Sequence, residues 1–538
     1  MQGCWRYACC LVLVMNPLRI AILAKAGTAF DDWETRLIAG INDHSDLKLV
    51  GVFAVESDAQ VARNRALNWL MSIERKTLMR LRRPPGPQPP EPPRIEPLSP
   101  DQNFPEADIY LSHCRGGWSK SHTPEAGELW GYDILLGGDG RTAGMAEVAS
   151  RAPTTTCALI RKVGDGADVL DLSITNTKLF GALNNAYLKD KLVPIVLRAL
   201  GRRQRNVLTP AKEEPPVVPH AGPGPVQYAV ALISGLVGQT LSKLGGKLGA
   251  RNDEWSLLSG QGDILQPDLK SLTELSQPAS EFRADPFLFD HDGDTLVFFE
   301  ALPYASGRGR IKVGRLAGNQ LADEVELDLG DIHLSYPFVF EQDGQIFMIP
   351  ETHQRDRVEV WRATRFPSEW ALHATALDGC SPADTALVAH GGDFWLFTNL
   401  KSGAFADHGQ ELHIFRTDGP DLTWLEPHAD NPVVIDTTSA RNGGRPFHQD
   451  GALFRPAQIF SHGNYGHGLK IMRVTDLTPS TYREEEVLSI TPEPGSGTTG
   501  CHHLDVLGDR FIIDARRAFG SPKWGAKPIR LRVSRPAD

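Results

Sequence analysis

The sequence predicts two folds in one chain: an α/β domain in the N-terminal part and an all-β, five-bladed propeller in the C-terminal part. Over residues 15–205, apolar strands alternate with amphipathic helices, a pattern typical of a parallel sheet covered by helices. A proline-rich linker at 206–226 follows, and it marks a boundary because proline fits neither a helix interior nor a central strand. Over 251–538 a three-strand pattern then recurs five times, as in repeat architectures.

The composition indicates a globular protein without a nucleic-acid partner. The 538 residues carry a net charge of -10, with 41% hydrophobic and 23% charged residues, whereas nucleic-acid binding requires a basic domain or stripe. The seven cysteines have no regular spacing, so neither a disulfide framework nor a zinc site is predicted. Such cysteine usage is typical of a reducing compartment. We therefore expect a cytoplasmic protein, and we expect no metal and no cofactor.

Residues 1–14, MQGCWRYACCLVLV, contain an apolar run that is too short to span a bilayer. We interpret them as an upstream mis-start, with Met15 as the natural domain start. The alternative is a leader, although no small-residue cleavage site follows.

The α/β domain is predicted from runs of apolar residues and from helical spacing between them. The predicted strands lie at 18–24, 47–55, 107–113 and 132–139, and the predicted helices at 29–44 and 58–81.

A connecting helix is predicted at 227–250, after the linker. One interpretation is a helix that packs on a neighbouring domain. The alternative is a helix that makes a weak contact with a membrane surface.

Each repeat of the C-terminal part begins with a hairpin, because Asp-Gly or Gly-Gly separates two apolar runs and tight turns need positive φ. A third strand then follows in each copy. Three-strand repeats of about 50 residues predict propeller blades. The turn glycines are Gly293, Gly344, Gly392, Gly451 and Gly508, and the third strands are 310–316, 358–364, 412–418, 469–476 and 529–534.

The chain ends soon after the fifth third strand, so the last blade lacks an outer strand of its own. We expect the segment EWSLLSG at 254–260 to supply that strand and to close the ring.

Candidate catalytic residues lie on the strands that line the propeller channel. Asp285 and Asp384 both stand eight residues before their turn glycines, Tyr336 holds the same place in the second repeat, and Glu351 follows the second strand there. Carboxylates around one pocket suit glycoside chemistry, in which one acid is protonated and another is ionised. The alternative is that these acids cap turns through their own backbone.

Polar residues also cluster at 440–458 and at 500–503. Arginine forks suit sugar hydroxyls, carboxylates or phosphates, and the alternative is a network of ion pairs between blades. Of the adjacent His502 and His503, one at most lines the channel, because neighbouring strand residues face opposite ways. The candidate substrate-binding residues are Tyr336, Arg441, Arg445, His448, Arg455, Gln458 and His503.

The stretches RADPFLF, HLSYPFVFEQDGQIFMIPET, SPADTALV at 381–388, ARNGGRPF and YREEEVL resemble, in order, the N-terminal propeller of glucosamine inositolphosphorylceramide transferases. That propeller is similar to five-bladed glycosidases of the arabinanase and invertase type. The resemblance implies that Asp285 matches their first-blade acid, Asp384 a later-blade acid and Glu351 an acid-catalyst position.

The N-terminal part resembles the degenerate formyltransferase-like domain that is fused to such propellers in bacterial proteins. Residues 132–152 lie where the strand and helix before the catalytic turn are expected, but no histidine follows them. The resemblance therefore concerns the fold alone.

These observations predict a carbohydrate-active or carbohydrate-binding propeller that works on glycan or glycolipid precursors. The second hypothesis is a non-catalytic sugar-recognition scaffold for a partner glycosyltransferase. The third is a formyltransferase that acts through the N-terminal domain.

Overall fold

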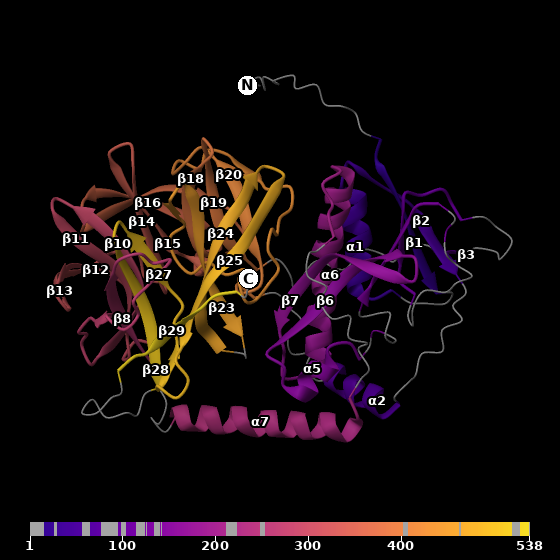
Figure 1. Ribbon diagram of the computed structural model, residues 1–538, viewed down its shortest axis with the longest axis horizontal. Helices are drawn as coiled ribbons and strands as arrows, with labels where there is room; N and C mark the ends of the chain where they lie inside the picture. The colour runs from indigo at the N-terminus through magenta and orange to yellow at the C-terminus, as the bar shows by residue number, and fades with distance from the viewer. Residues whose placement is uncertain are drawn as a thin grey trace.

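The computed structural model shows an α/β part and a five-bladed propeller, with the long helix α7 lying along one side of both (Figure 1). The predicted fold class is therefore confirmed. Residues 1–14 and most of the linker lie outside the described residues. The structure describes residues 16–25, 30–55, 65–76, 95–97, 104–114, 124, 126–133, 140, 142–210, 223–247, 253–401, 407–461, 464–518 and 528–536.

The α/β part is built on a seven-stranded sheet with the order β3-β2-β1-β4-β5-β6-β7. The strands from β3 to β5 run parallel, and β6 and β7 are antiparallel to their neighbours. β5 begins at Glu128 and ends at Tyr132, earlier than the predicted strand, of which 134–139 lie outside the described residues. The strands are β1 (Leu18–Lys25), β2 (Leu47–Val55), β3 (Glu96–Pro97), β4 (Ile109–Ser112), β5 (Glu128–Tyr132), β6 (Thr154–Val163) and β7 (Gly166–Asn176).

Helices cover this sheet because its strands are apolar on both faces, as parallel strands usually are. Helix α6 packs against α1, β6 and β7, and the apolar residues of these elements form one buried cluster around Leu37, Leu192 and Ile195. The helices are α1 (Asp32–Asp43), α2 (Arg65–Glu74), α5 (Met145–Ser150), α6 (Gly181–Gln204) and α7 (Pro225–Lys247). No helix among the described residues is long and apolar enough to cross a bilayer.

The first three blades are four-stranded antiparallel sheets whose strands follow the chain order. Their strands are β10 (Glu281–His291), β11 (Asp294–Pro303), β12 (Arg310–Ala317) and β13 (Gln320–Glu326); β14 (Ser335–Gln342), β15 (Gln345–Glu351), β16 (Val358–Arg365) and β17 (Glu369–Ala376); and β18 (Pro382–His390), β19 (Asp393–Leu400), β20 (Leu412–Thr417) and β21 (Leu425–Pro427).

Blades four and five are five-stranded. In every blade the predicted glycine lies in the turn between the first two strands, and the φ angles of these glycines fall between 61° and 90°. Blade four contains β22 (Phe447–Gln449), β23 (Ala452–Ser461), β24 (Asn464–Thr478), β25 (Thr481–Pro492) and β29 (Leu531–Ser534), and blade five contains β26 (Thr498–Gly500), β27 (Leu504–Leu507), β28 (Arg510–Ala518), β8 (Asp253–Gln261) and β9 (Thr273–Glu274).

An early segment of the chain closes the ring in the last blade, as the sequence predicts, but the predicted outer position is wrong, because β9 is the outer strand there. β8 pairs antiparallel with β28 along its whole length, so the segment 254–260 lies in the last blade. The assignment of 529–534 as the third strand of that blade is wrong. β8 takes that place, and β29 is added to the outer edge of blade four. The physical reason is burial, because β8 buries both Leu257 and Leu258, whereas β29 buries Leu531 alone.

The α/β part packs against the chain segment that connects blades three and four. The backbone of Ile174, in β7, pairs with that of Ile435 and Thr437, and Ile435 joins the buried cluster of the α/β part. The Nζ of Lys191 in α6 donates to Glu411 at 2.7 Å, and both side chains are buried.

We expect Lys191→Met to lower the free energy of unfolding by about 3 kcal/mol, because it leaves the buried charge of Glu411 without its main partner. Chemical unfolding at neutral pH measures this loss. The double variant Lys191→Met/Glu411→Gln should recover most of it, and a double variant as unstable as the single one would contradict the explanation.

The same pair predicts a pH dependence. Burial alone would raise the pKa of Glu411, but Lys191 and His413 outweigh it and lower the pKa to about 2. The ordinary pKa of a glutamate is about 4.5. The stability that Glu411 contributes is thus fully present above about pH 4.5 and is lost as the pH falls toward 2. In Glu411→Gln, this part of the acid dependence of unfolding should disappear.

Candidate functional site

The inner strands of blades one, two and three carry an equivalent residue in the left-handed backbone region. Asp285, Tyr336 and Asp384 have φ angles of 49°, 49° and 47°, and the strand register breaks at each of them. These are β-bulges, which turn a side chain away from its place in the ladder. A non-glycine residue is uncommon at positive φ, so the structure places all three residues in equivalent positions by a shared backbone distortion.

The second strand of each blade adds a polar side chain beside the bulge. Four of these residues stand seven positions after the turn glycine. The fifth, Asp514 in β28, stands six positions after Gly508, and its side chain accepts from the backbone N–H of His503. The four are Glu300, Glu351, Asn399 and Gln458.

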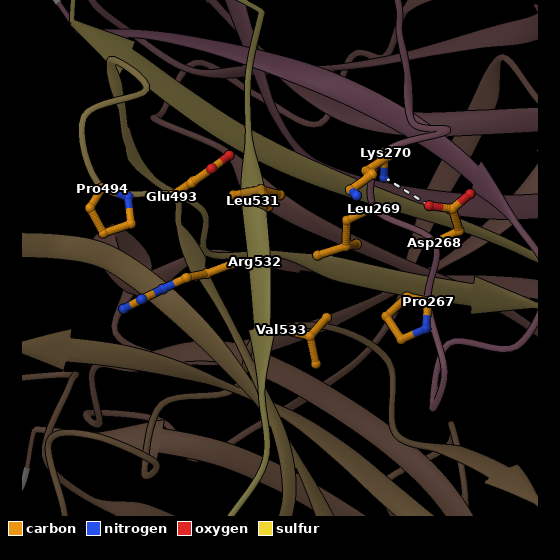
Figure 2. A pocket seen from close by; sticks show the side chains of 9 residues that line it. All are labelled: Pro267, Asp268, Leu269, Lys270, Glu493, Pro494, Leu531, Arg532 and Val533. Carbon is orange, nitrogen blue, oxygen red and sulfur yellow. Dashed lines mark hydrogen bonds between the residues drawn. The ribbon is translucent and has the colours of Figure 1, made fainter.

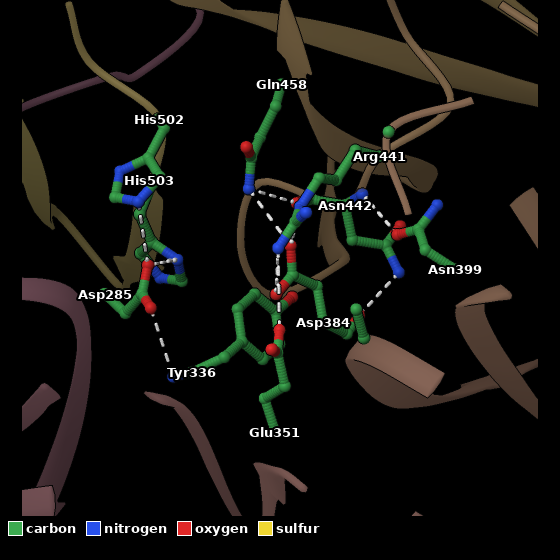
Figure 3. A network of polar contacts seen from close by, with 12 residues as sticks. Asp285, Tyr336, Glu351, Asp384, Asn399, Arg441, Asn442, Gln458, His502 and His503 are labelled. Atoms are coloured by element: carbon green, nitrogen blue, oxygen red, sulfur yellow. Dashed lines mark hydrogen bonds and ion pairs between the residues drawn. The ribbon is translucent and has the colours of Figure 1, made fainter. Parts of the chain in front are cut away.

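Arg441 joins the acids of blades two and three. Its Nε donates to Asp384 Oδ2 at 2.6 Å, and its Nη2 lies 3.3 Å from Asp384 Oδ1 and 3.5 Å from Glu351 Oε2. Figure 3 shows the two carboxyl groups and the guanidinium meeting on one side of Tyr336, with Asp285 on the other. The structure thus brings together residues from three separate blades.

Because Arg441 contacts both, Asp384 and Glu351 lie close enough to influence each other's ionisation. Burial raises the pKa of Asp384 well above its ordinary value, against the charge of Arg441, and Glu351 raises it further. Burial alone would also raise the pKa of Glu351, but the hydrogen bond from His353 and the charge of Arg441 lower it. The two carboxyl groups therefore share one proton, held on Asp384, and one negative charge that Arg441 balances.

Two amides support this arrangement. Gln458 Nε2 donates to Asp384 Oδ2 at 3.1 Å and to the carbonyl of Asn442 at 2.9 Å, and Asn442 Nδ2 donates to the carbonyl of Asp384 at 2.8 Å. The Oε1 of Gln458 is buried and has no hydrogen-bond partner among the described residues. An acceptor of this kind beside a carboxyl group is suited to bind a ligand hydroxyl.

Asp285 belongs to a second group, with His502 and Asp514. His502 Nδ1 lies 2.6 Å from Asp514, and its Nε2 lies 3.4 Å from Asp285. Burial, opposed by His502 and reinforced by Asp514, raises the pKa of Asp285 to about 6. Burial would lower the pKa of His502, but Asp514 and Asp285 raise it. An acid poised near neutral pH beside a charged imidazole is suited to proton transfer.

The ligand atoms of Asp285, His502 and Asp514 lie within 4.8 Å of one another, close enough to hold a metal ion. However, Asp514 already accepts hydrogen bonds from the backbone N–H groups of Asp285, His502 and His503 as well as from the ring of His502. The protein itself therefore saturates these oxygens, and the arrangement is explained without a cation.

His503 is wholly buried between aromatic rings. It packs edge-on against Phe287 and Tyr336, and burial lowers its pKa to about 3. It is neutral at neutral pH. The hydroxyl of Tyr336 donates to the carbonyl of Gly444 at 2.9 Å, so Tyr336 separates the two acidic groups.

Partly exposed rings border the acids. Tyr465 is 38% exposed, lies over the guanidinium of Arg441 at 5.1 Å and contacts His502. His353 Nδ1 donates to Glu351 at 2.7 Å, and His333 approaches Glu300 at 3.4 Å. An exposed aromatic face beside buried acids is a suitable surface for a sugar ring.

Three predicted binding residues have other surroundings. Arg445 binds Asp505 and two backbone carbonyls, and Arg455 is buried in a bidentate pair with Glu484. His448 stacks on His390. The binding roles of these three residues stay predictions. In the structure, the contacts of both arginines link separate segments of the propeller.

Glu300 and Tyr465 were missing from the predicted site. Burial raises the pKa of Glu300 well above its ordinary value, and the charges of Asp285 and Glu351 raise it further. The sequence does contain a signal for Glu300. VFFE at 297–300 aligns with MIPE at 348–351, which places Glu300 at the position of Glu351. Tyr465 has no such signal, because it lies near the start of β24 outside the hairpin repeat.

A pocket of about 530 Å³ lies elsewhere, at the outer edge of blade four (Figure 2). It lies against β29, the edge strand farthest from the acids in its sheet. Its lining residues are Pro267, Asp268, Leu269, Lys270, Glu493, Pro494, Leu531, Arg532 and Val533. The two acidic residues of its lining, Asp268 and Glu493, are both exposed.

Comparison with known proteins concerns the propeller. Residues 268–507 match the family model described as "Glucosamine inositolphosphorylceramide transferase 1, N-terminal". The propeller resembles that N-terminal domain. The chain is 37% identical over 238 residues to glucosamine inositolphosphorylceramide transferase 1 of Oryza sativa subsp. japonica, which covers 42% of this chain and 31% of the relative. The Arabidopsis thaliana protein is 34% identical over 266 residues, 47% of this chain and 34% of the relative.

This chain therefore spans about a third of the length of the curated relatives it matches. Among solved structures, the catalytic domain of a GH62 alpha-L-arabinofuranosidase from Coprinopsis cinerea aligns with 52% of this chain and 96% of that domain, at 11% identity and a TM-score of 0.36. A GH43_1 enzyme from Xanthomonas citri aligns with 47% of this chain and 92% of its own, at 10% identity and a TM-score of 0.32. Alignments this weak indicate neither a substrate nor a reaction.

The shared proton predicts how the site tolerates mutation. Asp384→Asn should change the free energy of unfolding by less than about 1 kcal/mol, because an amide replaces a carboxyl group that is already neutral. Arg441→Met should cost about 3 kcal/mol, because it leaves a buried charge on Glu351. The double variant Arg441→Met/Glu351→Gln should recover most of that loss. Thermal unfolding at neutral pH compares the three, and an Asp384→Asn as unstable as Arg441→Met would contradict the shared proton.

Proposed function

We propose that the propeller binds the sugar part of a glycan or glycolipid precursor at its axial acids. The observation that carries this proposal is the convergence of Asp285, Glu351 and Asp384, from three blades, around Arg441 and the exposed ring of Tyr465. Sugars need clustered hydrogen-bonding groups next to an aromatic face, and this site offers both. The name of the matched relatives, glucosamine inositolphosphorylceramide transferase 1, contains both a sugar and a lipid and supports the same ligand class.

Recognition fits the geometry better than hydrolysis by the Glu351–Asp384 pair. The acids of a glycosidase stand apart on either side of the scissile bond, at roughly 5 Å or more. Here one guanidinium, that of Arg441, reaches both carboxyl groups, at 2.6 Å from Asp384 and 3.5 Å from Glu351, so the two acids lie on the same side of any bound substrate. They are suited to hold sugar hydroxyls through the acceptor oxygens that face the ligand.

A catalytic role is the second candidate, and the environment of Asp285 favours it. Its pKa is raised to about 6 by burial, whereas Asp384 is held protonated. Two carboxyl groups whose pKa values are set by different surroundings can serve as base and acid. In this mechanism Asp285 would take a proton and Asp384 would donate one, on opposite sides of Tyr336. The sugar-recognition scaffold for a partner glycosyltransferase remains compatible with the first candidate.

Formyl transfer gains no support from the α/β part. His113 follows β4 at the sheet edge where ligands bind in such folds. However, its Nδ1 is bound to Glu34 and its Nε2 to Tyr132, and Trp33 stacks on its ring. Both ring nitrogens are occupied by the protein, so this histidine is not available to a substrate.

Binding of the full chain to a panel of glycans, glycolipid head groups and nucleotide sugars tests the proposal. We expect one class to bind, with Asp285→Asn and Gln458→Ala weakening the affinity about tenfold or more. The matched control is Asp292→Asn, the same substitution at an exposed turn of the same hairpin, which should bind like the wild type. An unchanged binding profile in both site variants would contradict the proposal.

The catalytic candidate has a separate readout. With a substrate found in that screen, kcat/KM should rise as the pH increases through about 6, where Asp285 becomes ionised. Asp285→Asn should abolish turnover and this rise together. Turnover that persists in Asp285→Asn would exclude Asp285 as the base and leave sugar binding as a separate question.

A further inference from the structure

Helix α7 exposes a continuous apolar stripe. Val226, Val230, Ile233 and Val237 recur at spacings of four, three and four residues, which places them on one helix face, and each is between 51% and 77% exposed. The opposite face is packed, as one of the two sequence interpretations predicted. Most monomeric proteins expose such residues singly, so an aligned stripe indicates a surface that binds something.

The packed face joins α7 to α2 and α5. Tyr228 and Leu232 share a small apolar cluster with residues of α2 and α5, and the hydroxyl of Tyr228 donates to Glu74 of α2. On α2, Trp69 points away from that cluster and is 64% exposed. Figure 1 shows α7 along the edge of the molecule, with α2 beside its N-terminal end. The apolar stripe of α7 thus lies on the side of the helix opposite its contacts with α2 and α5.

Basic residues outnumber acidic ones in and just after α2, α5 and α7, where the acidic residues are Glu74 and Glu147. The sequence of α7 contains no Asp or Glu and includes Lys243 and Lys247. Lys76, just after α2, and Arg151, just after α5, are exposed. The one acid of α2, Glu74, is buried against Tyr228. A basic and apolar strip on a protein whose net charge is -10 is a local feature, not a general one.

Apolar and aromatic residues flanked by basic ones are the pattern of helices that lie flat on anionic membranes. The 23 residues of α7 give it a length of about 35 Å, and no described helix can cross a bilayer. A second copy of this chain would bring two basic strips together, which like-charge repulsion opposes. We infer that the exposed face of α7 docks the protein on the surface of an anionic lipid membrane.

Co-sedimentation of the full chain with vesicles tests this inference. We expect binding to phosphatidylcholine vesicles that contain about a third phosphatidylserine, and weaker binding without the anionic lipid. The variant Val230→Glu/Ile233→Glu should reduce vesicle binding about tenfold or more, because it places charges in the apolar stripe. Both side chains are exposed, so this variant should keep the melting temperature of the wild type.

The matched control is Leu372→Glu, at an exposed leucine of β17 in the propeller, which should bind vesicles like the wild type. Equal vesicle binding by the wild type and the double variant would overturn the inference. Size-exclusion chromatography gives the other overturning result. If the wild type were a dimer, the double variant a monomer, and neither bound vesicles, the stripe would bind a second copy of the chain. The test does not depend on a sugar ligand, so its outcome is separate from that of the proposed function.

Discussion

The axial site depends on the charge balance between Arg441 and the carboxyl groups of Asp384 and Glu351. A buried guanidinium requires a partner, and a pair of buried carboxyl groups cannot hold two negative charges at close range. One shared proton satisfies both requirements. The rest of the site follows from this balance, because Gln458 and Asn442 are oriented by Asp384, and His353 by Glu351. These bonds fix one arrangement of side chains from several blades, and they leave the Oε1 of Gln458 without a partner among the described residues.

Backbone strain places these side chains on the axis. A bulge residue in the left-handed region costs on the order of 1 kcal/mol, and the propeller accepts that cost in three successive blades. Each bulge is compensated locally, since Asp285 accepts from the backbone of Tyr336 and donates its own N–H to Asp514. The strain is therefore shared between neighbouring blades, and it aligns one residue from each at the same depth.

The sequence predicted much of this because a repeated backbone geometry leaves a repeated spacing. Counting back from the turn glycines identified Asp285, Tyr336 and Asp384 as equivalent, and counting forward identifies Glu300 beside Glu351. The remaining features have no repeat position. Tyr465 lies outside the hairpin repeat, and the place of β8 in the last blade was decided by burial of Leu257 and Leu258 against competing strands. In the same way, the contacts that occupy Arg445 and Arg455 are set by tertiary packing, which spacing along the chain does not encode.

The connection that carries Arg441 also joins the two parts of the protein. Ile435 and Thr437 pair with the backbone of Ile174 in the α/β sheet, and the hydroxyl of Thr437 accepts from Asn176 at 2.7 Å. Four residues later the same segment delivers Arg441 to the acids. The α/β part thus fixes one end of the segment while the carboxyl pair fixes the other. A displacement of the α/β part against the propeller would therefore move the segment that carries Arg441. The charge balance of the axial acids thus depends on the packing between the two parts.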